Sequence, residues 1–444
     1  MAFDTIIVGG GIAGLLTGAI LAKNGQKVLL LEKYSMLGGR SNSIEYKKGY
    51  VVDFGIHLIR YSTKSSMYKI FKKELGEKLD IINCGDIKLF QDGAFHDFPL
   101  SMRGLASTDI FNEEEKKAFG PVLADFLSLK VDNYLDVSVP DYIKELENKH
   151  GEFSKPIKDF LVVVANLMCV STKTEMLSAG EFVDGIKTGA KAPSGTCYPR
   201  GGWKAIIERL SEIIKENGEI RIKSKVDSVK IEGGTVKGLN IGGEFIEADT
   251  IILAIPSKSI FDLIPEANFS QEFVKIAKNI IPTVGVFMDF GLKEKISDHN
   301  GTILTREPFT MSFFASNLDE TIVPENEQIY TIFQPTELDV ISDKDKITKV
   351  KDNLMDILNK MYPNFSDKII WYRTNAGIVD GAVPFITQHR NLRPNVRSKI
   401  NGLYFAGDSY GVPGTGGEIA HTSALLCAKA VLEDRQKVKS MITD

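Results

Sequence analysis

The sequence predicts an α/β protein in which a domain with a parallel sheet and a β-meander is joined to a mixed domain of antiparallel strands and helices. The first observation is a buried apolar strand at 5–8 that runs into the glycine spacing GxGxxG and then into a helical pattern. The second is a series of short strands over 219–254, separated by paired glycines. The third is a set of alternating apolar runs after residue 256, which is typical of a second, antiparallel sheet.

The glycines of the first turn each have a mechanical role. Gly9 permits a tight turn, Gly11 lets the backbone approach a pyrophosphate, and Gly14 lets the helix pack closely on the strand. A second apolar strand, 27–31, ends at Glu32, 18 residues after Gly14. A carboxylate at this point accepts hydrogen bonds from ribose hydroxyls and disfavours a 2′-phosphate. The turn therefore predicts a Rossmann-like dinucleotide site.

Arg40 is the next charge along the chain, directly after Gly38 and Gly39. A guanidinium beside two glycines fits pairing with a pyrophosphate, and a surface salt bridge is the structural alternative. Alternating runs at 43–46 and 50–57 then predict an extended excursion that returns to the first domain.

The middle of the chain divides into a helical and a strand-rich part. From 62 to about 196 the pattern is mostly helical, which predicts an inserted helical region. A helix at 204–216 and the strands of 219–254 then rejoin the first domain. The second sheet and the helix after it are predicted at 283–290, 309–315, 328–333 and 347–361.

Two domains follow from this order. The predicted dinucleotide-binding domain is discontinuous and comprises 1–85, 196–258 and 375–444. The predicted substrate-binding domain comprises 86–195 and 259–374 and contains the helical insertion.

The closing segment supplies a second carboxylate for the same site. An apolar strand at 400–408 ends in Gly407 and Asp408, and a helix follows at 418–433. Because ligands of a doubly wound sheet bind at the carboxyl ends of its strands, Asp408 is expected to meet the dinucleotide that the first turn holds.

Composition excludes several classes of protein. A formal charge of −4 and a pI near 6.0 give no basic footprint for nucleic acid.

Four cysteines without CxxC spacing predict a reducing, cytoplasmic setting, and six histidines in no ligand spacing predict no metal site. The first strand begins by Thr5, which leaves no room for a signal peptide. The longest apolar stretch, 160–170, is too short to cross a bilayer and predicts a buried helix or an interfacial surface, so peripheral membrane contact stays open.

With the motifs above, the segments 201–202, 254–256 and 402–408 resemble FAD-dependent oxidoreductases that include phytoene (carotenoid) desaturases, protoporphyrinogen oxidases and flavin amine oxidases. The resemblance implies FAD, hydride transfer between a substrate carbon and flavin N5, and a helix near Gly417 whose positive end faces the flavin pyrimidine. It assigns Glu32 to the adenosine ribose, Arg40 to the pyrophosphate, Val226 to adenine through its backbone, and Asp408 to the ribityl-pyrophosphate part. The cofactor-binding residues that it implies are Gly9, Gly11, Ile12, Ala13, Gly14, Glu32, Lys33, Gly38, Gly39, Arg40, Val226, Gly407, Asp408, Gly416, Gly417 and Glu418.

Within this superfamily the loops 53–57, 199–202 and 381–384 are most similar to the phytoene desaturase branch, which implies a small hydrophobic, isoprenoid or polyene-like substrate. The loop 408–418 departs from that branch's glycine and proline arrangement. A protoporphyrinogen or amine oxidase is therefore the first alternative. An amine substrate calls for aromatic side chains at the flavin, with Tyr372, Tyr404 and Tyr410 as candidates.

A second alternative belongs to another class, because prenyl-binding escort proteins share the fold without catalysing a reaction. For the enzyme, family position implies four residues that approach the flavin: His57, Tyr410, Glu418 and His421. Packing is the structural alternative for each of them. The oligomeric state, the electron acceptor and the direction of the reaction stay open.

Overall fold

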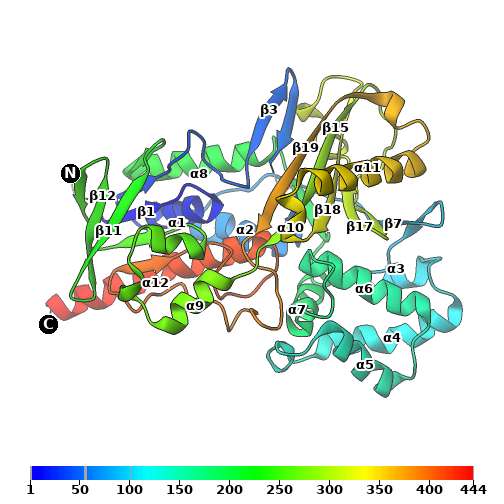
Figure 1. The fold of residues 1–444 in the computed structure, drawn as a ribbon, viewed down its shortest axis with the longest axis horizontal. Helices are drawn as coiled ribbons and strands as arrows, with labels where there is room; N and C mark the ends of the chain where they lie inside the picture. The colour runs from blue at the N-terminus through cyan, green and yellow to red at the C-terminus, as the bar shows by residue number, and fades with distance from the viewer. Residues whose placement is uncertain (1–2, 55–57, 101, 444) are drawn as a thin grey trace.

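A parallel sheet of five strands forms one end of the molecule (Figure 1). The computed structural model describes residues 3–54, 58–100 and 102–443. The strand order is β10-β2-β1-β14-β20, with parallel pairing throughout. The bounds are β1 Thr5–Val8, β2 Val28–Leu31, β10 Glu219–Arg221, β14 Ile251–Leu253 and β20 Leu403–Phe405. Every residue of β1, β2, β14 and β20 is buried, as expected for strands that helices cover on both faces.

Three helices pack with this sheet: α1 Ile12–Lys23, α8 Trp203–Asn217 and α12 Gly417–Thr443. Helix α1 is buried from Ile12 to Ala22 and lies between α8 and α12. The meander lies beside the sheet as β11 Val226–Glu232, β12 Thr235–Ile241 and β13 Glu244–Glu247. These elements confirm the predicted fold of the first domain.

A seven-stranded sheet forms the other half, in the order β19-β15-β18-β17-β16-β7-β8. Its pairing is antiparallel except between β16 and β7. The bounds are β7 Lys88–Gln91, β8 Ala94–Asp97, β15 Thr283–Leu292, β16 Ile303–Arg306, β17 Phe309–Phe313, β18 Gln328–Thr336 and β19 Ile369–Asp380. Helix α11, Lys344–Met361, packs on it through Leu354 and Leu358. The boundary predicted between 374 and 375 falls inside β19, and the domain division stays a prediction.

The α-helices described in the insertion share one apolar core (Figure 1). They are α3 Met102–Ser107, α4 Glu113–Ser128, α5 Val139–His150, α6 Lys155–Cys169 and α7 Ala179–Gly189. The region 62–196 is less helical than expected, because β7 and β8 lie within it and extend the seven-stranded sheet.

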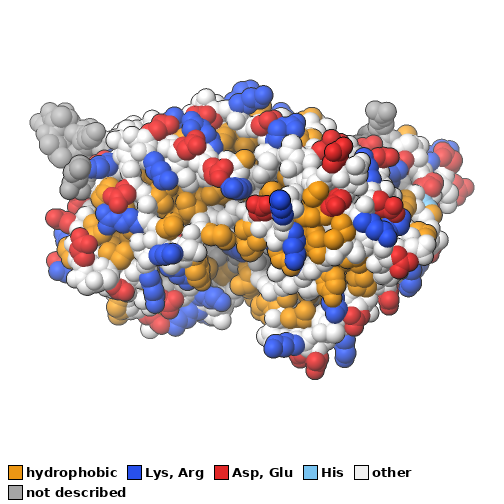
Figure 2. Space-filling view, turned by 90° about the horizontal axis from the view of Figure 1, so that it is seen from above, with side chains coloured by type: hydrophobic (Ala, Val, Ile, Leu, Met, Phe, Trp, Pro, Cys, Tyr) orange, Lys and Arg blue, Asp and Glu red, His pale blue; other side chains and the backbone are white. Residues whose placement is uncertain are grey.

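Short elements connect the two halves. The hairpin β3 Ser43–Lys47 and β4 Tyr50–Asp53 is one of them, and the small sheet of β5 Ile59–Arg60, β6 Ile81–Asn83 and β9 Thr196–Pro199 is another. The short helices are α2 Ser66–Lys69, the π-helix Ile70–Leu75, α9 Gln271–Asn279 and α10 Leu338–Ile341. Short 3₁₀ helices lie at Ser62–Lys64, Val131–Tyr134, Ser257–Asp262, Glu266–Asn268, Ala315–Asn317, Glu320–Ile322 and Ser366–Lys368. Figure 2 shows charged side chains of both signs interspersed with hydrophobic ones along the visible face.

Candidate active site

The turn between β1 and α1 has the geometry that its glycines predict. Gly9 has φ +110°, and a Cβ there would clash with the carbonyl oxygen of Ala254. A Cβ on Gly14 would clash with the carbonyl oxygen of Gly9. At Gly11, by contrast, a Cβ would meet no described atom within 4 Å. The turn is therefore tight on its protein side and open at Gly11, where α1 begins.

Glu32 ties the end of β2 to this turn. Its Oε2 accepts a hydrogen bond from the Gly10 amide at 2.7 Å, and its Oε1 accepts one from the Tyr34 amide at 2.8 Å. The Ser224 amide donates to the Glu32 carbonyl at 2.8 Å, which brings the start of β11, and with it Val226, to the same end of the sheet. The neighbouring Lys33 is exposed, and its ammonium lies 4.8 Å from the ring centre of Tyr34.

Arg40 and Asp408 form an ion pair at 2.9 Å. Arg40 Nη1 also donates to the Val379 carbonyl at 2.9 Å, and the Gly381 amide donates to Asp408 Oδ2 at 2.6 Å. The chain segment after β2 is thus joined to the end of β20 and to the end of β19. Both residues were predicted to act on a dinucleotide, but their pairing with each other was not anticipated.

A cavity of about 800 Å³ begins at the start of α12 and reaches the seven-stranded sheet. Gly416, Gly417, Glu418 and His421 line it at the α12 end. Its apolar wall comes from the sheet and from the end of α6 and the residues after it: Phe287, Met311, Phe313, Phe333, Leu167, Met168 and Val170. The apolar stretch 160–170 is therefore both core of the insertion and wall of this cavity.

Of the predicted catalytic residues, Glu418 and His421 lie together at the cavity. Both are buried, and His421 Nδ1 lies 3.3 Å from Glu418 Oε1. Glu418 Oε2 accepts a hydrogen bond from the Ser66 amide at 2.8 Å. Tyr410 lies apart from them in the core of the parallel-sheet half, where its ring stacks on Phe405 and its hydroxyl donates to the Ile255 carbonyl at 3.2 Å. His57 lies outside the described residues.

Two charged residues that line the cavity beside Gly416 were not anticipated, Arg60 and Asp380. Arg60 donates to the carbonyls of Leu167 and Met168 at 2.8 and 2.7 Å, and to Thr415 Oγ1 at 3.0 Å. Burial, together with the nearby charge of Asp408, raises the pKa of Asp380 to about 6. The one available signal was a carboxylate at the end of a strand pattern, directly before Gly381.

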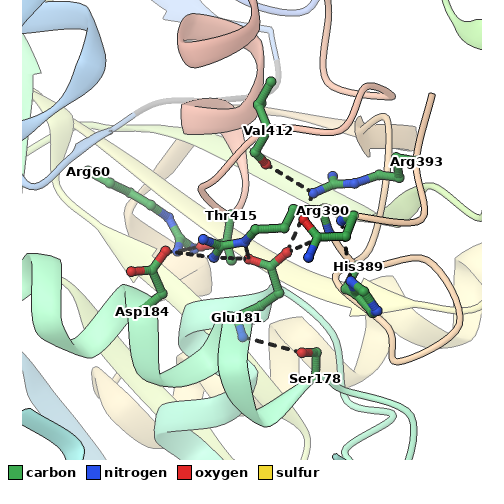
Figure 3. A network of polar contacts seen from close by, with 10 residues as sticks. Arg60, Ser178, Glu181, Asp184, His389, Arg390, Arg393, Val412 and Thr415 are labelled. Atoms are coloured by element: carbon green, nitrogen blue, oxygen red, sulfur yellow. Dashed lines mark hydrogen bonds and ion pairs between the residues drawn. The ribbon is translucent and has the colours of Figure 1, made fainter. Parts of the chain in front are cut away.

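Two arginine clusters fix the loop between β20 and α12 (Figure 3). Arg60 holds Thr415, as described above, and Arg393 Nη2 donates to the Val412 carbonyl at 3.3 Å. Glu181 of α7 pairs with Arg390 and lies 3.6 Å from Arg393. These contacts join the helical insertion to the loop that presents the start of α12 to the cavity.

The parallel sheet with its glycine turn has the arrangement of a dinucleotide-binding fold, and the antiparallel sheet faces it across the cavity. The chain belongs to the family described as flavin containing amine oxidoreductase, whose family model matches residues 12–432. It is therefore an FAD-dependent oxidoreductase, as the sequence motifs predicted, and the non-catalytic escort alternative is not supported.

Relatives with assigned activities align along nearly the whole chain. The chain is 24% identical to a 4,4′-diapophytoene desaturase of Staphylococcus haemolyticus, over 96% of this chain and 98% of the relative. It is 25% identical to the chloroplastic prolycopene isomerase of Daucus carota, over 97% of this chain and 80% of the relative. A crystal structure of an oxidoreductase from Methanosarcina mazei has the same fold, with a TM-score of 0.79, 20% identity, and coverage of 96% of this chain and 100% of that one.

The residues present fit FAD at the glycine turn. The open space at Gly11 lies at the start of α1, where backbone amides attract an anion, and Glu32 lies at the neighbouring strand end. Within the described ranges no group of three or more His, Cys, Asp or Glu residues is arranged to hold a metal ion. No helix in the described part of the chain is long and apolar enough to span a membrane.

Proposed function

We propose that this enzyme is phytoene-desaturase-like and moves a hydride between a hydrophobic isoprenoid or polyene-like substrate and FAD. The observation that carries the proposal is the cavity, because its wall of phenylalanine, methionine and aliphatic side chains ends at the start of α12. Apolar substrates bind in such cavities by burying their surface, and few polar groups are needed to orient them. The activities of the desaturase and isomerase relatives agree with this substrate class.

Each part of the site has a role in this proposal. Gly9 and Gly14 shape the first turn, Gly11 lets its backbone approach the pyrophosphate, Glu32 holds the ribose, and Arg40 and Asp408 hold the middle of the cofactor. When bound, FAD supplies N5 as the hydride acceptor. The amides at the start of α12 stabilise negative charge that develops nearby, and the apolar wall excludes water and aligns the substrate carbon.

The amine oxidase alternative has less support from the cavity. Tyr404 is buried with its hydroxyl on Asp434, and Tyr372 is 50% exposed. Neither they nor Tyr410 belong to the described cavity lining. An amine oxidase site with an aromatic pair at the substrate would therefore have to be built from residues other than these three tyrosines.

The test is anaerobic reduction of the bound FAD, which is measured as the loss of its visible absorbance. Phytoene and 4,4′-diapophytoene in detergent are expected to reduce it, whereas a primary amine and protoporphyrinogen are not. Met311→Trp, which fills the cavity, is expected to slow reduction by the polyene at least about 10-fold while FAD content is unchanged. Met311→Leu is the matched control. Reduction by the amine or the porphyrinogen, and not by either polyene, would contradict the proposal.

A further inference from the structure

Asp380 is a carboxyl group buried at the junction of the two halves. It is the last residue of β19, it is 2% exposed, and it lines the cavity beside Gly416 and Gly417. A Cβ built on Gly416 would lie 3.7 Å from Asp380 Oδ2. The carboxyl therefore lies against the start of α12, at the end of the cavity that the proposed function assigns to the chemistry.

Asp380 and Asp408 are two neighbouring carboxyl groups with different surroundings. Asp408 accepts hydrogen bonds from Arg40 Nη2 at 3.0 Å and from the Gly381 amide at 2.6 Å. Asp380 Oδ1 accepts none from any residue that the structure describes. When two carboxyl groups differ in this way, the one with fewer hydrogen bonds is the better proton acceptor.

The charges around Asp380 leave it able to exchange a proton near neutral pH. Burial, followed by the charge of Asp408, raises its pKa to about 6, while Arg40, Arg60 and His421 act in the opposite direction. A base with such a pKa is mostly ionised at neutral pH and still binds a proton well enough to act in general base catalysis.

Three other titratable groups that line the cavity, Glu418, Tyr61 and Asp97, are already engaged or keep their proton. Both carboxylate oxygens of Glu418 have contacts, one with the Ser66 amide and one with His421 Nδ1. Burial raises the pKa of the Tyr61 phenol, which keeps that group protonated at neutral pH. Asp97 pairs with Lys88 at 2.5 Å, on the strands β7 and β8.

We propose that Asp380 is the catalytic proton acceptor of the oxidation. This inference rests on the proposed function. Oxidation of a –CH–CH– unit to –C=C– breaks two C–H bonds. One hydrogen leaves as hydride and passes with its electron pair to oxidised FAD, which is thereby reduced. The hydrogen on the neighbouring carbon leaves as a proton to the Asp380 carboxylate, and the electron pair of that bond forms the new π bond.

Three variants separate this role from a structural one. Asp380→Asn removes the proton acceptor with little change of shape, and Asp380→Glu retains a carboxyl. Asp289→Asn is the control, because Asp289 is equally buried but lies outside the cavity, paired with Arg373 and bonded to Thr331. FAD content is measured first in each.

The first measurement is the single-turnover rate of anaerobic FAD reduction by phytoene between about pH 5 and pH 8. The wild-type rate is expected to rise with pH and to level off above neutrality. Asp380→Asn is expected to lower the rate about 10²–10⁴-fold and to abolish the rise, with unchanged FAD content. Asp380→Glu is expected to keep the rise. Asp289→Asn is expected to lower stability, because it leaves Arg373 without its carboxylate, and to keep the wild-type rate and pH profile. An Asp380→Asn protein with the wild-type rate and pH profile would overturn the inference.

The second measurement needs no substrate and distinguishes failure of the inference from failure of the proposed function. Infrared difference spectra of the FAD-loaded protein between acidic and neutral pH report protonated carboxyl groups. A titrating band present in the wild type and missing in Asp380→Asn supports Asp380 as a proton-holding group, and a band that persists overturns it. If neither polyene reduces wild-type FAD, the proposed function fails, whereas the infrared result still decides the role of Asp380.

Discussion

At the scale of single residues, Glu32 and Asp408 carry the charge of the proposed cofactor site. Both are buried and accept hydrogen bonds from backbone amides, so each is held in one orientation. Glu32→Ala or Asp408→Ala is expected to weaken FAD binding about 10- to 100-fold, because each removes a hydrogen bond to a charged group. Titration of the apoprotein with FAD, followed by flavin fluorescence, measures this. Glu244→Ala, at an exposed residue of β13, serves as the control, and unchanged affinity in both acidic variants would contradict the assignment of Glu32 and Asp408.

The raised pKa of Asp380 also predicts how the free energy of unfolding depends on pH. Because burial raises its pKa to about 6, the folded protein binds this proton more tightly than the unfolded chain does. The stability linked to this group is therefore complete under acidic conditions and is lost as the pH rises through the folded-state pKa. Between about pH 4 and pH 8 the wild type is expected to lose free energy of unfolding through this group, and Asp380→Asn is not. The difference in free energy of unfolding between the variant and the wild type is therefore expected to be more favourable to the variant at pH 8 than at pH 4, by on the order of 2 kcal/mol. Urea denaturation of both proteins at the two pH values measures it, and a pH-independent difference would contradict it.

At the scale of elements, the turn between β1 and α1 contains one glycine that is needed for folding, Gly14, and one that is expected to be needed for FAD binding, Gly11. A methyl group at Gly14 would meet the Gly9 carbonyl, whereas a methyl group at Gly11 would enter open space. Gly14→Ala is therefore expected to destabilise the protein by about 2–4 kcal/mol. Gly11→Ala is expected to retain nearly wild-type stability and to lose FAD affinity. Thermal unfolding of the apoproteins and FAD titration test the pair. Equal destabilisation by both substitutions would contradict the open space at Gly11, and wild-type FAD affinity of Gly11→Ala would show that this space is not a ligand site.

The elements also show which parts of the fold are encoded locally. The strand, turn and helix of 5–23 were predictable because a buried strand and glycines required by close packing are neighbours in sequence. Strands β7 and β8 were not, because each is only four residues long and only one of these eight residues, Leu89, is buried. In addition, β7 pairs with β16 more than 200 residues later. Asp380 was missed for the same reason, since the groups that surround it come from residues 40, 60, 408 and 421.

At the scale of the whole molecule, a buried ionic cluster connects the helical insertion to the parallel-sheet half (Figure 3). Glu181 and Arg393 are fully buried, and Arg390 is nearly so. Besides its contacts with Val412 and Glu181, Arg393 leaves Nε and Nη1 without a hydrogen-bond partner in the described chain. Glu181 is thus the carboxylate that compensates two buried guanidinium groups, and the position of the loop before α12 depends on it.

Glu181→Gln is therefore expected to destabilise the protein by about 3–5 kcal/mol, since it leaves the buried Arg393 charge without its carboxylate and Arg390 with Asp184 alone. Asp184→Asn, on the same helix but 30% exposed and in contact with Arg390 alone, is expected to cost about 1 kcal/mol or less. Denaturant unfolding curves, recorded through the release of FAD, measure the stability of both variants. Because the cluster holds the loop that leads into α12, Glu181→Gln is also expected to release FAD at a lower denaturant concentration than the control does. Equal midpoints for the two variants would show that the charge of Glu181 does not couple the insertion to the FAD site.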